Sequence, residues 1–204
     1  MQTCEIVLAT ASPRRRALIS KIKGVKPIFM PVDVTELVFS SARETATVNA
    51  RLKGECAVSK IELPVLAFDT VVGIGDKVLG KPKTREQAVG MFELLCGKTH
   101  EVITAVYLNT GAKCARNGKK SKIIEKFEKT TVTFGAFDKE LVYNYVDGGY
   151  PFDKAGGYNI DDPQIKPLII GVNGEYDNVV GLPVALTEKL LEENLFYGED
   201  GNCA

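Results

Sequence analysis

One nine-residue stretch, residues 64–72, constrains the fold of this chain more than any other. It reads PVLAFDTVV and is apolar except for one acid and one hydroxyl, so we predict a buried strand there. Other strand-like runs alternate with amphipathic helical patterns along the chain, without internal repeats. A length of 204 residues is enough for one domain with a substantial core. The sequence therefore predicts an α/β fold.

Turn and capping residues place the expected elements. Gly75-Asp76 predicts a hairpin turn, and Thr84 is expected to cap the next helix, with Gln87 completing a capping box. A loop at 109–120, rich in Gly, Lys and Asn, is expected to be flexible, and residues 199–204 to be frayed. The remaining expected elements are strands at 4–9, 25–32, 101–108, 122–134 and 168–172, and helices at 13–22, 42–61, 139–146 and 184–195.

Composition excludes several classes of protein. The 26 basic side chains balance the 26 acidic ones, so no broad field for nucleic acid or a membrane surface is expected. Five scattered cysteines without a C-x-x-C pair favour a reducing compartment over a disulfide framework or a zinc site. Because the sequence starts with polar residues and has no long apolar run, we expect no signal peptide and no membrane-spanning helix. We therefore expect a soluble, cytoplasmic protein.

Several common catalytic motifs are also missing from the sequence. There is no G-x-x-x-x-G-K-[ST] loop and no G-x-S-x-G elbow, and Gly73-Ile74-Gly75 lacks the third glycine of a dinucleotide fingerprint. His100 is the only histidine, so a Ser-His-Asp triad would have to use it. A nucleophilic pair of Cys96 with His100 is disfavoured because a helix end and a strand start separate them.

The segment Leu8–Arg16 is the clearest candidate for binding a ligand. Ser12 and Pro13 suit the N-cap and the first position of a helix. Three arginines, 14 to 16, then occupy the first turn, where the helix dipole makes cations unfavourable. Free N–H groups and guanidinium groups together form a receptor for phosphate, so we expect an anion here. A solvated basic turn is the alternative.

Asp69 is the one acid in the predicted buried strand. A carboxylate among apolar neighbours is costly unless it meets a cation, a metal or a hydrogen-bond donor. Such an acid is either half of a structural ion pair or a metal ligand or proton carrier at a site. Ligands of open α/β sheets bind at strand ends, where the loop of Ser12 would also lie. We therefore favour a role for Asp69 in a site.

Two shorter segments carry additional signals. Gly80-Lys81-Pro82 holds a lysine on a constrained loop before a helix, where it could contact phosphate. In residues 151–158, two glycines follow Asp153 and Lys154. That pattern indicates either close approach of the backbone to a ligand or a tight turn.

Six ordered motifs are spread over most of the chain. They are Leu8-Ala9-x-x-Ser12-Pro13-Arg14-Arg15, Phe68-Asp69-Thr70-Val71-Val72, Gly80-Lys81-Pro82, Gly97-x-Thr99-His100-x-Val102, Asp153-Lys154-Ala155-Gly156-x-Tyr158 and Asn178-Val179-Val180-Gly181-Leu182-Pro183. Taken together, these motifs resemble those of the Maf family of nucleoside triphosphate pyrophosphatases. The resemblance implies a single two-lobed domain over residues 1–204, with a long twisted mixed sheet like that of the inosine-triphosphate pyrophosphatases. It also implies an active-site cleft between the lobes, a divalent metal (Mg²⁺ or Mn²⁺) and a homodimer.

The implied reaction is hydrolysis between the α- and β-phosphates of a nucleoside triphosphate, which gives a monophosphate and pyrophosphate. The resemblance assigns Asp69 and Glu36 to the metal and the attacking water, and we predict that Asp69 accepts the proton of that water. Asp33, in the same loop as Glu36, is the alternative second carboxylate. Cations are needed around the leaving pyrophosphate, and Ser12 adds neutral donors. The implied cations are Arg14, Arg15, Lys53 and Lys81.

Three positions bear on the preferred base. Family members that prefer dTTP and UTP carry Arg after Ser-Pro and Thr after the catalytic acid, and Arg14 and Thr70 match them. The third position usually carries Gln, but Asp161 stands here. An ionised Asp only accepts hydrogen bonds, so Asp161 could serve the N3–H of a pyrimidine and leave O4 to another group. A dTTP/UTP pyrophosphatase is predicted, with a different base such as 7-methyl-GTP as the alternative.

Two other functions belong to different classes. The same pocket could bind nucleotides as a regulator of cell division with little turnover, although a pure binder has no need of a carboxylate beside the α-phosphate. An RNA-binding module would need aromatic residues interleaved with basic ones, and the sequence has no such cluster. Release of pyrophosphate discriminates the enzyme from the regulator.

Overall fold

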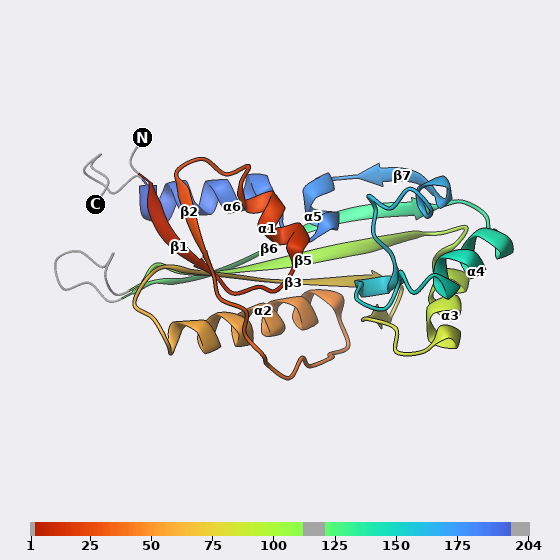
Figure 1. Ribbon diagram of the computed structural model, residues 1–204, viewed down its shortest axis with the longest axis horizontal. Helices are drawn as coiled ribbons and strands as arrows, with labels where there is room; N and C mark the ends of the chain where they lie inside the picture. The colour runs from red at the N-terminus through yellow and green to blue at the C-terminus, as the bar shows by residue number, and fades with distance from the viewer. Residues whose placement is uncertain (1–2, 112–120, 197–204) are drawn as a thin grey trace.

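The computed structural model describes residues 3–111 and 121–196, which form one elongated mixed β-sheet with helices packed around it (Figure 1). Within these ranges seven strands run in the order β2–β1–β3–β5–β6–β7, with β4 paired to β3. The expected α/β class with a mixed sheet is confirmed. The strands are β1 Cys4–Leu8, β2 Val25–Phe29, β3 Val65–Ile74, β4 Lys77–Leu79, β5 Thr99–Asn109, β6 Ile123–Phe134 and β7 Ile169–Asn173.

Helices cover both faces of the sheet. Helix α2 lies along one face, α1 and α6 lie on the other, and α3 and α4 close the far end (Figure 1). No helix in the described ranges is long and apolar enough to cross a membrane. The α-helices are α1 Pro13–Ile19, α2 Ala42–Val58, α3 Arg85–Leu95, α4 Lys139–Asp147, α5 Tyr176–Val180 and α6 Val184–Leu191. Two short 3₁₀ helices, η2 Ala155–Gly157 and η3 Lys166–Leu168, and one π-helical segment, η4 Glu192–Phe196, complete the helical structure of the described residues.

The capping residues behave largely as expected. The Thr84 hydroxyl caps α3 by accepting a hydrogen bond from the backbone N–H of Gln87 at 3.2 Å. The Gln87 side chain, however, accepts from the N–H of Lys83 rather than that of Thr84. The reciprocal hydrogen bond of this capping box therefore reaches the residue before the N-cap, and not the N-cap itself. Two backbone N–H groups are still satisfied.

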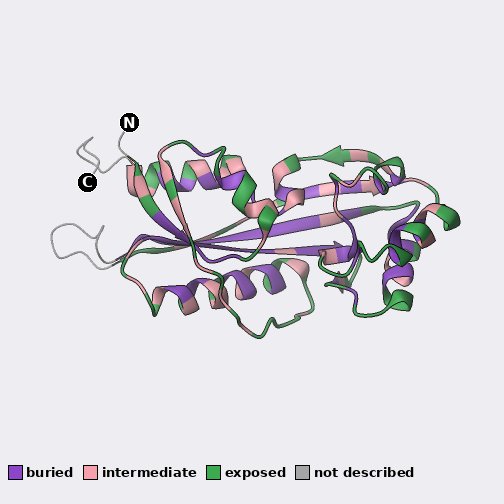
Figure 2. Cartoon of the chain, in the orientation of Figure 1, coloured by how far each residue is buried: buried purple, intermediate pink, exposed green. Residues whose placement is uncertain are grey.

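The central strands of the sheet are largely buried (Figure 2), and the alternation of side chains along β3 separates two cores. Phe68 packs with residues of α1 and α6, whereas Ala67 and Val71 pack with the alanines of α2. Because successive side chains of a strand point to opposite faces, Asp69 projects toward α2 and Thr70 projects toward α1. A third core, built around the aromatic rings of α3, α4 and β6, fills the far end of the molecule.

Strand lengths leave a gap beside β3. The parallel pairing of β1 with β3 ends at Leu66, and the antiparallel pairing of β4 with β3 begins at Val72. The opposite edge of β3 is paired with β5 without interruption. Asp69 and Thr70 thus lie in the gap, where side chains from both faces of β3 can reach one space.

Two expectations fall outside the described residues. The segment predicted as a loop at 109–120 begins with Asn109, the last residue of β5, and residues 110–111 have no regular structure; residues 112–120 are not described. The predicted frayed end at 199–204 is not described either.

Candidate active site

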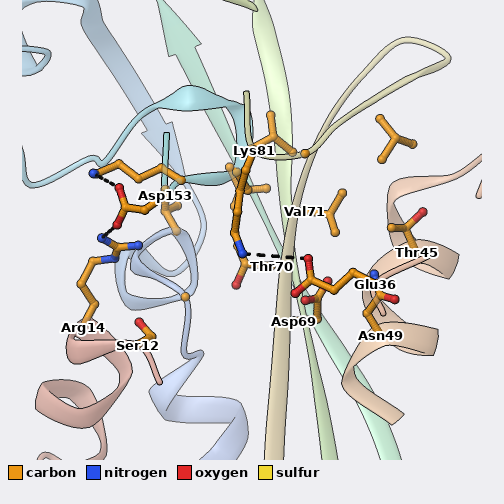
Figure 3. A pocket seen from close by; sticks show the side chains of 18 of the residues that line it. Ser12, Arg14, Glu36, Thr45, Asn49, Asp69, Thr70, Val71, Lys81 and Asp153 are labelled. Carbon is orange, nitrogen blue, oxygen red and sulfur yellow. Dashed lines mark hydrogen bonds and ion pairs between the residues drawn. The ribbon is translucent and has the colours of Figure 1, made fainter. Parts of the chain in front are cut away.

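A cavity occupies the gap beside β3, and segments distant in the sequence meet there (Figure 3). Every residue that the sequence analysis placed around the phosphates lines it, together with both proposed catalytic carboxylates. These residues are Ser12, Arg14, Arg15, Glu36, Lys53, Asp69 and Lys81. Thr70 lines it as well, so of the predicted site residues only Asp161 is missing from the walls.

Lys53 joins the two carboxylates. Its Nζ lies 2.5 Å from Asp69 Oδ1 and 2.6 Å from Glu36 Oε1. Asp69 is only 6% exposed, so the ammonium group supplies the partner that a buried acid requires. Two carboxylates from different elements thus converge on one positive charge. Asp33, the alternative to Glu36, is exposed and does not line the cavity.

The segment that carries Glu36 is fastened to α2 by two polar side chains. Asn49 accepts from the N–H of Leu37 at 2.8 Å and donates to its C=O at 2.9 Å. Thr45 accepts from the N–H of Phe39 at 3.0 Å. Both side chains are buried, and both residues line the cavity.

Sequence reasoning missed Asn49 and Thr45 as site residues. The available signal was the spacing of Thr45, Asn49 and Lys53, which recur every four residues and so share one face of the helix. Three polar side chains in a row on the buried face of a helix are unusual. Their joint role becomes visible only once the segment around Glu36 is placed beside them.

The arginines of the first turn of α1 have separate roles. Ser12 caps the helix and accepts from the N–H of Arg15 at 3.4 Å. Arg14 extends across the mouth of the cavity to Asp153 Oδ2 at 3.4 Å (Figure 3). Arg16 turns outward, with its guanidinium 4.9 Å from the centre of the Phe29 ring. Thus only two of the three arginines face the cavity.

Arg15 is directed inward and covers the open edge of β3. Its Nη1 donates to the C=O of Phe68 at 2.9 Å, Nη2 donates to Thr70 Oγ1 at 2.9 Å, and Nε donates to the C=O of Gly181 at 2.7 Å. Burial lowers the pKa of Arg15 from its ordinary value, although the nearby carboxylate of Asp69 opposes the shift. The side chain ties α1 to β3 and to the turn before α6.

Lys81 and Lys154 bring two more cations to the far side of the cavity. Lys81 Nζ lies 3.9 Å from Glu36 Oε2, and its side chain is half exposed. The Lys154 ammonium contacts the carboxylate of Asp153 and the C=O of Tyr150. The C=O of Gly80 accepts from the N–H of Gly156 at 2.9 Å, which joins the two loops. A Cβ at Gly156 would lie 2.8 Å from the Val72 side chain, so glycine at this position permits close approach of the loop to β3.

The two carboxylates differ in acidity. Burial raises the pKa of Asp69 above its ordinary value, and the charge and hydrogen bond of Lys53 only partly offset that effect. Burial also acts on Glu36, but Lys53 and Lys81 outweigh it and hold the pKa of Glu36 below its ordinary value. Glu36 is therefore the stronger acid, and Asp69 is the better proton acceptor.

Asp161 lies away from the cavity. Its Oδ1 accepts from the Tyr176 hydroxyl at 2.7 Å, and the residue is exposed. Tyr158 and Asn159 are the members of that segment that line the cavity. The assignment of Asp161 to the base is untested by this arrangement and stays a prediction.

A divalent cation such as Mg²⁺ needs oxygen ligands, which carboxylates supply. No group of three or more His, Cys, Asp or Glu side chains suited to a metal occurs in the described part of the chain. Asp69 and Glu36 converge on the single cation of Lys53, and Mg²⁺ is commonly held by only one or two carboxylates plus substrate phosphates and water. The two acids therefore fit a metal that arrives with a polyphosphate.

Comparisons with known proteins find relatives that match most of the chain. The family described as "Maf-like protein" matches residues 5–194. The chain is 39% identical over 191 residues to the dTTP/UTP pyrophosphatase of Carboxydothermus hydrogenoformans, covering 93% of this chain and 98% of the relative. It is 36% identical over 191 residues to the dTTP/UTP pyrophosphatase of Pyrococcus furiosus, covering 92% and 94%. Among solved structures it is similar to the Staphylococcus aureus Ham1 protein, with a TM-score of 0.49, 16% identity and coverage of 93% and 98%.

Proposed function

The chain belongs to the Maf family, and we propose that it is a dTTP/UTP pyrophosphatase that cleaves the α–β phosphoanhydride to give a nucleoside monophosphate and pyrophosphate. One observation carries the proposal. The buried Asp69 and the second carboxylate, Glu36, both contact the ammonium group of Lys53. Further basic side chains line the same cavity, and their positive charge can balance that of a polyphosphate. This arrangement suits attack by water at phosphorus next to a leaving pyrophosphate.

In the proposed reaction Asp69 accepts a proton from a water molecule as its oxygen bonds to the α-phosphorus. The bond from that phosphorus to the bridging oxygen breaks, and the electron pair leaves with pyrophosphate. Three basic side chains that line the cavity can neutralise the negative charge that develops on this leaving group: Arg14, Lys53 and Lys81. Ser12 adds a neutral donor at the start of α1.

Asp69 and Glu36 would hold Mg²⁺ or Mn²⁺, and Lys53 would then transfer its interaction from the carboxylates to phosphate. Such a metal supplies charge neutralisation and orients the phosphates when it is bound. Glu36 is suited to this role because its lowered pKa keeps it ionised.

We expect Asp69→Asn to abolish release of pyrophosphate while the fold and nucleotide binding remain. Loss of a proton acceptor in general base catalysis costs about 10²–10⁴ in rate. Turnover would be measured on dTTP, UTP, 5-methyl-UTP, CTP, ITP and 7-methyl-GTP, with Asp33→Asn as the matched control. Wild-type turnover by Asp69→Asn would refute the assignment, and a purine triphosphate preferred by tenfold would refute the pyrimidine preference.

Homodimerisation and a cytoplasmic location complete the proposal, and both come from the family resemblance. Sedimentation equilibrium of the purified chain tests the first, because a single species of monomer mass at micromolar concentration would contradict a stable dimer. Localisation of the tagged chain by cell fractionation tests the second. A wild-type chain that binds dTTP but releases no pyrophosphate would instead favour the nucleotide-binding regulator.

A further inference from the structure

One edge of β3 is only partly paired with other strands. On that edge the N–H of Ala9, just beyond β1, donates to the C=O of Leu66 at 2.9 Å and ends the ladder with β1. Pairing with β4 begins only at Val72. Because the carbonyl groups of alternate residues point to the same edge of a strand, the C=O of Phe68 is the next acceptor after that of Leu66.

Arg15 takes the place of a strand at this carbonyl. Its Nη1 donates to the C=O of Phe68 at 2.9 Å, and its Nη2 donates to Thr70 Oγ1 at 2.9 Å. Its Nε donates to the C=O of Gly181 at 2.7 Å. All three nitrogens of the guanidinium group therefore have acceptors within the protein, two of them on β3 and one on the turn before α6.

The two contacts on β3 lie on either side of Asp69 in the sequence. A peptide group is planar, so the C=O of Phe68 and the Cα of Asp69 move together, and Thr70 is the next residue. On the opposite edge of the strand, Asp69 pairs with Ala105 of β5. The backbone of Asp69 is thus held at both edges of β3, while Lys53 holds its carboxylate.

Arg14 is held much less firmly than Arg15. Its single printed partner is the exposed carboxylate of Asp153 at 3.4 Å, which the oxygens of a phosphate could replace. If Arg15 turned toward a phosphate, the carbonyl groups of Phe68 and Gly181 would each lose a charged donor. A change of partner therefore costs more for Arg15 than for Arg14.

We propose that Arg15 is a positioning residue for Asp69: it continues the hydrogen-bond ladder of β3 where β1 ends, and it does not bind the leaving pyrophosphate. The inference rests on the proposed function and deepens it, because a proton acceptor works only when it is aimed at the attacking water. The alternative is that Arg15 contacts pyrophosphate as one of the surrounding cations.

Arg15→Lys separates the two roles. Lysine keeps the positive charge that a phosphate needs, but its single ammonium group cannot replace the planar fork that reaches three acceptors. We expect kcat for dTTP to fall on the order of 10- to 100-fold, since small displacements of a catalytic group have effects of that size. The affinity for magnesium pyrophosphate, by calorimetry, should stay within about threefold of wild type.

The neighbouring arginines provide the comparisons. Arg16→Lys is the matched control, because Arg16 carries the same charge on the same helix but lies against the Phe29 ring, outside the cavity. We expect its kcat and its pyrophosphate affinity to stay within about twofold of wild type. Arg14→Met removes a cation that is free to bind phosphate, and it should weaken pyrophosphate binding on the order of tenfold.

Hydrogen exchange reports the position of the strand without nucleotide or turnover. In Arg15→Lys we expect the amides of β3 around Asp69 to exchange faster than in wild type, because the free edge has lost its support. The amides of β6 should exchange at wild-type rates, which distinguishes a local change from general destabilisation. Arg16→Lys should show no change in either strand.

A wild-type kcat in Arg15→Lys overturns the inference, as does unchanged exchange in β3. Pyrophosphate binding weakened as much as in Arg14→Met also overturns it and favours the alternative. If Arg15→Lys does not fold, a crystal structure of the wild-type protein with Mg²⁺ and the α,β-imido analogue of dTTP decides. A phosphate oxygen within about 3.2 Å of an Arg15 nitrogen would then overturn the inference, and retention of the three protein acceptors without one would support it.

The two proposals can fail separately. Absence of pyrophosphate release by the wild-type protein overturns the proposed function, and hydrogen exchange in Arg15→Lys still shows whether Arg15 holds β3. Conversely, release of pyrophosphate from dTTP by wild type together with a fully active Arg15→Lys leaves the proposed hydrolysis intact and removes only the role of Arg15.

Discussion

Lys53 controls the charge state of the candidate site at the scale of single residues. Its ammonium group is the cation on which Asp69 and Glu36 converge, and it lowers the pKa of both. For Asp69 the effect of burial is larger, so its pKa remains above the ordinary value. The general base is therefore a carboxylate whose affinity for a proton is set by two opposing environmental effects.

We expect the pH dependence of kcat/KM to report this balance. The base acts when deprotonated, so activity is lost as the pH falls through the raised pKa of Asp69. In Lys53→Met the opposing positive charge is gone, the pKa of Asp69 rises further, and the acid limb moves to higher pH. The measurement is a pH–rate profile for both proteins. Lys21→Met, which removes an exposed ion pair with Asp177, is the control, and superimposable limbs for wild type and Lys53→Met would contradict the account.

Helix α2 organises the site at the scale of one element. Thr45, Asn49 and Lys53 lie four residues apart on one face, where the first two hold the backbone beyond Glu36 and the third holds its carboxylate. The segment that carries Glu36 has no regular secondary structure, and the rigid helix α2 holds it in position. This division is common in sites that need both reach and fixed geometry.

Asn49→Ala should loosen the segment that carries Glu36 while leaving Lys53 in place. A displacement of a catalytic group by about 1 Å can cost up to roughly a hundredfold in rate, so we expect kcat to fall within that range with a smaller change in KM. Steady-state kinetics on dTTP provides the measurement. Glu55→Ala, an exposed position on the same helix, serves as control, and equal kcat values for Asn49→Ala and wild type would show that the segment needs no clamp.

Gly54 is a point of close approach between α2 and the sheet. A Cβ at this position would lie 2.1–2.7 Å from three ring atoms of Tyr107 on β5, so even alanine requires the helix or the ring to move. Overpacking of this kind costs typically about 1–3 kcal/mol. We expect Gly54→Ala to lower the free energy of unfolding by that amount in urea titrations, and to reduce turnover because Lys53 is the adjacent residue.

A double-mutant cycle isolates this contact. In Tyr107→Leu the ring is absent, so the added methyl group of Gly54→Ala should cost much less than in the wild-type background. Additive losses in the double mutant would mean that the clash does not cause the destabilisation.

His100 links the stability of the whole molecule to pH. The ring is 1% exposed in the far core, its Nε2 lies 2.7 Å from the Tyr158 hydroxyl, and burial lowers its pKa to about 4. The unfolded chain binds a proton below about pH 6.5, whereas the folded chain does so only near pH 4. Stability should thus rise with pH between these values, and His100 should contribute a loss of about 3 kcal/mol on acidification across the window.

The prediction is checked by comparing wild type with His100→Phe in urea at pH 4.5, 5.5 and 7. Carboxylates titrate in both proteins, so the difference between them isolates the histidine. The unfolding free energy of wild type should fall more steeply with decreasing pH, by at most about 1.4 kcal/mol per pH unit. Parallel curves would show that His100 does not titrate differently in the two states.

Much of this architecture could be predicted because it depends on neighbours in the sequence. Apolar patterns predicted the strands and most helices within a few residues, with α5 as the exception, and Ser12 and Thr84 marked helix starts through local backbone chemistry. Asp69 was recognisable as a site residue since a lone acid in an apolar strand requires a partner. The motif resemblance connected that acid with Glu36 and Lys53.

Only the tertiary structure decided how the side chains divide their tasks. Arg14 and Arg15 are adjacent in sequence, yet one spans the mouth of the cavity and the other seals the edge of β3. That difference follows from the gap between β1 and β4, which depends on strand pairings far apart in the chain. Asp161, in turn, contacts the Tyr176 hydroxyl at the start of α5 and does not line the cavity. The local sequence determines which side chains are present at the site. The direction in which each side chain points depends on where strands from distant parts of the chain begin and end beside it.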